Sequence, residues 1–295
     1  MRSHEFDSVQ TAGLRATTRP EPVQVIAVTG GKGGVGKTSV SVNLAAALAG
    51  EGKRVLLFDG DLGLANVDVL LGLTPSYTLE HVLDGECTLE EAIVTAPQGF
   101  KVLPAASGVA RLASLSTPEH LGLVQAFSTI TTGLDVLIVD TAAGIADNVR
   151  QFCQAAQQVL VVLRDEPASL TDAYALVKVL SRSQGVSRFR ILANMSTVSG
   201  EGEALFRKLE RVTSRFLDVV LEYAGEVPED PFVRHAIREQ RTVIEAYPSS
   251  AAARAFRKLA RQAGGWPVAR GPRGNLEFFV ERLVARPQAQ MEAVT

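Results

Sequence analysis

The sequence predicts an α/β protein with a doubly wound, mostly parallel sheet and helices on both faces. Three observations support this fold class. Short apolar runs alternate along the chain with segments of helical periodicity, as in sheets built with helical crossovers. The runs are apolar throughout, for example at residues 54–58, which is typical of strands covered on both faces. A glycine-rich turn joins the first run to the first helical segment.

Each element follows from a local pattern. The first strand is predicted at residues 23–29 and is followed by the glycine-rich turn at 30–36. A helix over 37–50 is rich in Ala and Leu and closes on glycines. Two further helices are expected at 232–246 and 250–263, the second with a clear apolar face. The remaining strands are expected at 54–58, 100–103, 134–139, 158–163, 189–193 and, as a last short one, 219–227.

Composition divides the chain into a body and two ends. Residues 1–22 are polar with little periodicity and predict a flexible N-terminal arm. Residues 23–265 carry all the strand patterns and predict one domain. Residues 266–295 begin with a Gly/Pro-rich linker, followed by a short amphipathic helix over residues 276–284 and a tail.

Overall composition is that of a soluble globular protein, with 46% hydrophobic and 21% charged residues among 295 and a net charge of −2. The two cysteines, Cys87 and Cys153, form no CxxC, which argues against a disulfide framework or a zinc ribbon. With no signal peptide and no membrane-spanning run in view, we expect a cytoplasmic protein. Residues 231–286 hold eleven Lys and Arg against four Glu, which hints at an anionic partner or a solvated basic helix face.

The glycine-rich turn carries the strongest functional signal. Residues 31–38 fit G-x-x-x-x-G-K-[ST] between a strand and a helix, so backbone N–H groups would surround phosphate oxygens. Lys37 would neutralise the β- and γ-phosphates, and the Thr38 hydroxyl would bind Mg²⁺. The same stretch fits the G-x-G-x-x-G dinucleotide pattern, with Asp59 in the place of the ribose-binding acid. A dinucleotide loop has no use for Lys37 and Thr38, so a nucleoside triphosphate is favoured.

Two groups of carboxylates are expected near this loop. Asp140 ends an apolar strand, as in a Walker B motif that steadies Mg²⁺ and its waters. Asp59 and Asp61 end the second strand, where they would face the same crevice at the carboxyl edge of the sheet. Such neighbours would repel each other unless a cation or a polarised water lies between them.

These motifs resemble the deviant Walker A ATPases of the MinD/ParA family over about residues 23–265. Residues 32–38 resemble the deviant phosphate loop with its extra lysine, Lys32, and residues 59–68 and 140–144 resemble the two switch segments. Residues 192–195 and 227–230 are similar to the two segments on the adenine side. Within the family the chain looks most like the FlhG/FleN (YlxH) group, on residues 67–73, 165–167, 171–176 and 276–283.

The resemblance implies an ATPase that uses ATP and Mg²⁺ and dimerises with ATP. Lys32, Lys37, Asp61 and Asp140 would serve hydrolysis: Lys32 reaches the partner's phosphates and Asp61 orients the attacking water. Thr38, Asp61 and Asp140 would form the metal side. The nucleotide-binding residues would be Gly31, Lys32, Gly33, Gly34, Val35, Gly36, Lys37, Thr38 and Ser39 around the phosphates, with Asn194, Val227, Pro228 and Glu229 beside the adenine.

The resemblance also implies partners. FlhG/FleN proteins regulate flagellar number with the GTPase FlhF and, in polar flagellates, the transcriptional activator FleQ. Residues 10–15 partly resemble the arm that engages FlhF. The stripe on residues 276–284 either makes a peripheral membrane contact, as in MinD relatives, or packs on the body. A ParA-like DNA-partitioning ATPase, supported by the basic face of Arg254, Arg257, Lys258 and Arg261, and a MinD-like division-site protein remain the alternatives.

Overall fold

The computed structural model describes residues 22–61, 66–104, 117–131, 133–268 and 276–284. The predicted arm at 1–22, with its 10–15 motif, lies outside these residues except for Pro22. The strands are β1 (Gln24–Thr29), β2 (Val55–Gly60), β3 (Val94–Thr95), β4 (Lys101–Leu103), β5 (Val136–Thr141), β6 (Gln158–Leu163), β7 (Arg188–Ser196) and β8 (Val220–Pro228). The helices are α1 (Lys37–Gly50), α2 (Val67–Leu71), α3 (Leu79–Leu83), α4 (Leu89–Ala92), α6 (Thr117–Thr131), α7 (Asp147–Ala155), α8 (Pro167–Gln184), α9 (Glu201–Phe216), α10 (Pro231–Arg238), α11 (Val243–Ala246), α12 (Ala251–Gly264) and α13 (Leu276–Val284).

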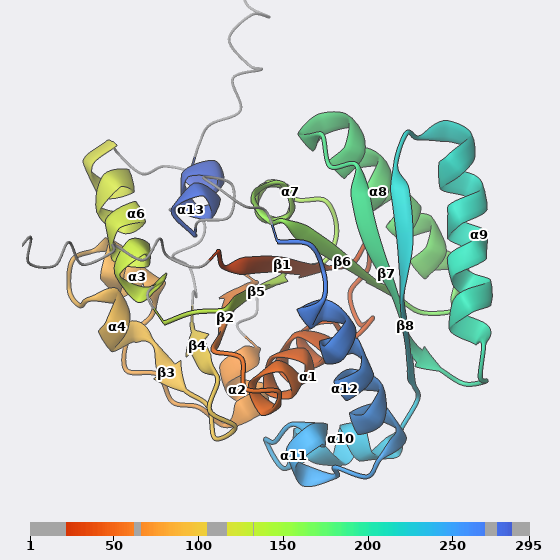
Figure 1. Ribbon diagram of the computed structural model, residues 1–295, viewed down its shortest axis with the longest axis horizontal. Helices are drawn as coiled ribbons and strands as arrows, with labels where there is room; N and C mark the ends of the chain where they lie inside the picture. Colours follow the sequence, from red (N-terminus) through yellow and green to blue (C-terminus); the bar gives the residue numbers. More distant parts are fainter. Residues whose placement is uncertain (1–21, 62–65, 105–116, 132, 269–275, 285–295) are drawn as a thin grey trace, which may run out of the picture.

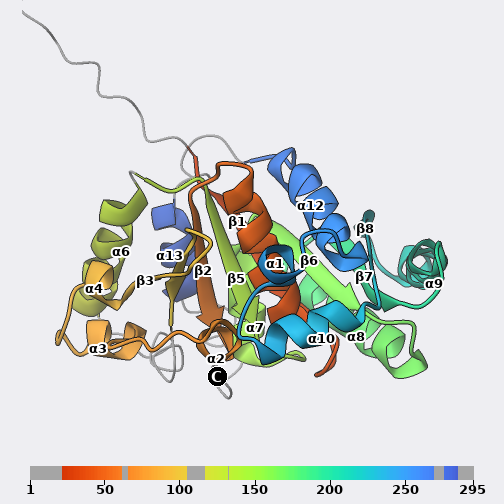
Figure 2. The same ribbon diagram turned by 90° about the horizontal axis from the view of Figure 1, so that it is seen from below.

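The strands form one sheet in the order β3-β4-β2-β5-β1-β6-β7-β8, in which only the β3–β4 pair is antiparallel. The predicted doubly wound, mostly parallel sheet is therefore confirmed. Helices α1 and α12 cover one face, while α6, α7, α8, α9 and α13 lie on the other (Figure 1 and Figure 2). Side chains of β1 alternate between the layers: Ile26 and Val28 pack in the α1 cluster, and Val25 packs on the opposite side.

The structure corrects several predicted boundaries. Strands β2 and β5 run to Gly60 and Thr141, so Asp59 and Asp140 lie inside the sheet and not beyond it. The helix predicted at 232–246 is two helices, α10 and α11. The break occurs where Gln240 takes a left-handed φ of 54° and the Thr242 hydroxyl accepts from Glu245 N–H to begin α11. The two-residue strand β3 was not predicted.

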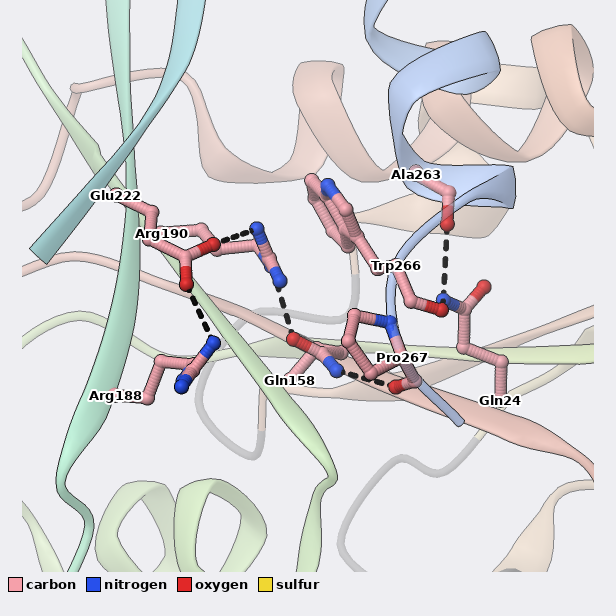
Figure 3. Close-up of polar contacts among 8 residues, drawn as sticks. All are labelled: Gln24, Gln158, Arg188, Arg190, Glu222, Ala263, Trp266 and Pro267. Carbon is pink, nitrogen blue, oxygen red and sulfur yellow. Dashed lines mark hydrogen bonds and ion pairs between the residues drawn. The ribbon is translucent and has the colours of Figure 1, made fainter. Parts of the chain in front are cut away.

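At the amino end of the strands, a buried polar network holds the chain after α12 (Figure 3). The Arg190 guanidinium lies 4.3 Å from the centroid of the Trp266 ring, pairs with Glu222, and donates to Gln158 Oε1 at 2.9 Å. Gln158 in turn donates to the Pro267 carbonyl at 2.7 Å. This network fixes the chain against the sheet up to the start of the linker.

Helix α13 packs on the body. Phe279, Val280 and Leu283 are buried in a cluster that includes Leu123 and Phe127 of α6. Figure 1 shows α13 between α6 and α7. The described part of the predicted stripe, at Phe279, Val280 and Leu283, is thus used for packing in this structure, as in the second of the two expected outcomes.

Candidate nucleotide-binding site

The phosphate loop occupies the turn between β1 and α1, at the centre of the sheet. Gly36 precedes α1 with a left-handed φ of 88°, a conformation that glycine adopts without strain. A Cβ on Gly31 would lie 2.3 Å from the Asp172 carbonyl oxygen, so α8 approaches the loop too closely for any side chain there. The loop leads directly into the amino end of the 14-residue helix α1, where the first backbone N–H groups have no partner within the helix and can bind an anion.

A cleft of about 730 Å³ opens over this loop. Lys37, Thr38 and Asp61 line it, as do three loop glycines and Ser39. Burial lowers the pKa of Lys37, while the nearby charges of Asp140 and Asp61 act in the opposite direction. The predicted residues Gly33, Gly34, Gly36, Lys37, Thr38, Ser39 and Asp61 are thus brought together around one cleft, whereas Val35 is buried.

Asp140 lies beneath the loop and is fully buried. The Ser41 hydroxyl donates to its Oδ1 at 2.7 Å, but its Oδ2 has no hydrogen-bond partner among the described atoms. Burial raises the pKa of Asp140 to about 6, against hydrogen bonds from Thr38 and Ser41 that lower it. A buried carboxylate oxygen left without a partner beside Thr38 suits a hydrated Mg²⁺, whose preferred ligands are oxygens.

Asp59 was predicted near the crevice, but its role was missed. It is the sheet partner of Asp140 across β2 and β5. Its carboxylate accepts the backbone N–H groups of Asp61, Asn66 and Val67, each at 3.2 Å. Burial and the charge of Asp140 raise the pKa of Asp59 to about 7. Asp59 therefore holds the backbone at Asp61 and at the start of α2, through contacts that are local in the sequence.

Lys32 does not line the cleft. Its Nζ lies 3.1 Å from Glu166 Oε2, and Arg164 lies 3.4 Å from the other oxygen of that carboxylate. The hydrogen bond and charge of Lys32 lower the pKa of Glu166. In the single chain the extra lysine is thus held by an acid just before α8.

The residues predicted to lie beside the adenine surround a second cleft of about 190 Å³, adjoining Ser39. Asn194, Val227, Pro228 and Glu229 all line this cleft. The Asn194 side chain also donates to the Val35 carbonyl at 2.8 Å, so it holds the phosphate loop as well as bordering the cleft. This contact joins β7 to the loop.

The basic face of α12 is largely occupied by internal contacts. Arg254 donates to the Ser249 carbonyl, and Arg257 donates to the Pro248 carbonyl at 2.6 Å. Arg261 lies 3.7 Å from Glu51. The contacts with carbonyl oxygens leave the guanidinium charges in place, so Arg261 alone of these three arginines has an acidic partner among the described residues.

Such a loop at the centre of a doubly wound sheet, with Asp140 beneath it, defines a P-loop NTPase. Residues 22–263 match the ParA family, described as NUBPL iron-transfer P-loop NTPase, and the chain belongs to the ParA/MinD family. It is 59% identical over 266 residues to antiactivator FleN of Pseudomonas aeruginosa, covering 90% of this chain and 95% of that one.

Two more distant relatives agree with this placement. Flagellum site-determining protein YlxH of Helicobacter pylori is 33% identical, covering 88% of this chain and 86% of the relative. The septum site-determining protein MinD of Pyrococcus horikoshii, complexed with Mg-ADP, is 27% identical with a TM-score of 0.64, covering 81% of this chain and 95% of that chain. Among the described helices, none is long and apolar enough to cross a membrane.

Proposed function

We propose that this protein is an ATP-dependent dimerising switch that regulates flagellar number and biosynthesis, acting as an antiactivator of a flagellar transcriptional activator. The observation that carries the proposal is the 59% identity to antiactivator FleN over nine-tenths of the chain, together with the phosphate loop. The similarity to YlxH supports the flagellar role, and the Mg-ADP complex of the MinD relative supports the choice of ligand.

The site residues are suited to slow hydrolysis of ATP to ADP and phosphate. Lys37 and the N–H groups of the loop would neutralise and orient the phosphates, and Asp61 at the cleft would orient the attacking water. Mg²⁺, when bound, would add charge neutralisation, held by Thr38 directly and by Asp140 through its water shell, with Asp61 nearby. Asn194, Val227, Pro228 and Glu229 would border the adenine.

Lys32 would make hydrolysis depend on assembly. In the single chain it is held by Glu166, away from its own cleft. We propose that ATP-driven dimerisation transfers it to the partner's phosphates, whose charge exceeds that of one carboxylate. A lone chain would then bind ATP but turn it over poorly.

The proposed partners are the GTPase FlhF and a FleQ-like activator, with the protein in the cytoplasm. A peripheral contact with the membrane through Leu276–Val284 would require α13 to leave α6 and α7. The alternatives are a ParA-like DNA-partitioning function and a MinD-like division-site function, and the pull-down described next distinguishes them from the proposed function.

The test is a pull-down with two matched variants. Asp61→Ala should bind ATP, turn it over poorly and accumulate as a dimer, whereas Lys37→Ala should bind no ATP and stay monomeric. We expect FlhF or the activator to be retained by the Asp61→Ala protein with ATP and lost with Lys37→Ala. Retention of DNA alone, with steep salt dependence, would support the ParA-like function instead. Retention of neither protein, with strong ATP-dependent liposome binding, would support the MinD-like one.

A further inference from the structure

Helix α10 carries two arginines one turn apart that face successive parts of the nucleotide site. Arg234 lines the small cleft on the adenine side, and Arg238 lines the large cleft over the phosphate loop. Residues four apart lie on the same face of a helix. One helix thus presents a cation to each part of the site.

No structural contact accounts for either arginine within the part of the chain that the structure describes. No hydrogen bond or ion pair joins Arg234 or Arg238 to any other side chain or carbonyl there. Their neighbour Arg241 differs, since it lies 3.0 Å from Glu245 and 3.9 Å from Glu239. Arg238 is therefore an uncompensated cation at the cleft.

The position of α10 is well fixed at both ends. Asp230 caps the helix by accepting from Phe232 N–H at 3.0 Å, and its other oxygen accepts from Ala252 N–H of α12 at 3.0 Å. Just after the helix, the Gln240 side chain donates to the Val69 carbonyl of α2 at 3.3 Å. Arg238 is thus carried by a braced element, as a precise ligand contact needs.

We propose that Arg238 is a phosphate-binding residue that contacts the polyphosphate of the bound nucleotide from the α10 wall. This inference rests on the proposed nucleotide binding. The positive charge of Lys37 is partly offset by the nearby carboxylates of Asp140 and Asp61. A nucleoside di- or triphosphate brings several negative charges, and the guanidinium fork matches two phosphate oxygens at once.

A purely structural role for Arg238 is the competing explanation. A cation in the last turn of a helix also stabilises that helix through its dipole. That role would change thermal stability in the absence of ligand, but it would not depend on how many phosphates the ligand carries. The two explanations can therefore be separated.

The experiment is isothermal titration of the full chain with ADP, AMP and adenosine in Mg²⁺ buffer. Arg238→Gln should weaken ADP binding by about threefold to thirtyfold, as expected for one charged hydrogen-bonding contact. AMP should lose less and adenosine nothing, and the ADP effect should shrink at high salt. The matched control is Arg241→Gln, because Arg241 lies three residues after Arg238 and is already ion-paired with Glu239 and Glu245. This variant should bind all three ligands like wild type.

Wild-type ADP affinity in Arg238→Gln, or an equal loss for ADP and adenosine, would overturn the assignment while leaving nucleotide binding intact. A lower melting temperature for Arg238→Gln with unchanged ADP affinity would support the structural role. Failure of the wild-type protein itself to bind ADP would instead reject the proposed function.

Discussion

At the scale of single residues, the site depends on two buried carboxylates that are neighbours in the sheet. Asp59 and Asp140 are paired across β2 and β5, yet they are used differently. Asp59 accepts three backbone N–H groups, whereas Asp140 keeps one oxygen without a partner among the described residues. Asp59 therefore organises the backbone around Asp61 and Val67, and Asp140 has an oxygen available for the proposed Mg²⁺.

The raised pKa values of these groups predict how stability depends on pH. Burial raises the pKa of Asp59 to about 7 and that of Asp140 to about 6. In the unfolded chain both carboxyl groups have a pKa of ~3.9. Between this pKa and the folded-state values the folded protein binds more protons than the unfolded chain, so the free energy of unfolding falls as pH rises through this range. Without nucleotide, we expect the free energy of unfolding to decline from about pH 5 to 7.5, by up to about 1.4 kcal/mol per pH unit for each proton.

Asp59→Asn should remove much of that decline, measured by urea unfolding at a series of pH values. Asp135→Asn is the control, because a hydrogen bond from Arg54 lowers the pKa of Asp135. The stability that Asp135 contributes is present above its unfolded pKa and is lost only in acid, so the slope near pH 6 should not change. A wild-type profile that rises from pH 5 to 7.5 would contradict the prediction.

The Lys32–Glu166 pair predicts a second effect at this scale. If the pair holds Lys32 back in the single chain, Glu166→Gln should lower the protein concentration at which ATP produces a dimer, by only about twofold to fivefold because exposed pairs are weak. Asp165→Asn is the matched control, since its partner is Lys208 at 3.4 Å. Analytical ultracentrifugation with ATP measures both. Weaker dimerisation of Glu166→Gln would show that Glu166 instead supports the dimer.

At the scale of elements, the sequence predicted those ends of helices and strands that are set by neighbouring residues. Helix α1 and strand β6 begin and end as predicted, because glycines and apolar runs mark their ends. The split between α10 and α11 was missed, although Thr242 is a residue type that commonly begins a helix; the turn at Gln240 is also held by a contact with Val69, far away in sequence. The phosphate loop could be read as a continuous motif, but the pairing of Asp59 with Asp140 arises from strand register, and the Lys32–Glu166 contact joins residues far apart in sequence.

Helix α13 carries the element-scale prediction. Leu283→Ala should lower the free energy of unfolding by about 2–3 kcal/mol, because the side chain is buried against the body. Glu281→Ala, on the exposed side of the same helix, should change stability little. Urea unfolding measures both variants. Equal stability of Leu283→Ala and wild type would mean that the helix is undocked in solution and free for a membrane.

At the scale of the whole molecule, the nucleotide cleft opens on a face with exposed apolar side chains. Val69 and Ile237 line the cleft and are 63% and 39% exposed, and Ile145, after the second switch segment, is 49% exposed. Apolar groups around a charged site favour burial by a partner surface once the charge is neutralised. A second copy of the chain, bound to its own nucleotide, is the partner that the family suggests.

The dimer can be tested by mixing two inactive chains. Lys32→Ala should bind ATP but lose dimerisation and most turnover, while Asp61→Ala should dimerise without turnover. In a mixed dimer, the Asp61→Ala chain supplies an intact Lys32 to a site whose Asp61 is intact, so one of its two sites should recover hydrolysis. Light scattering must first confirm that mixed dimers form. Confirmed mixed dimers that release no phosphate would argue against action of Lys32 across the interface. Full dimerisation of the Lys32→Ala protein by itself would reject this role, because the lysine would then not be needed to join the two chains.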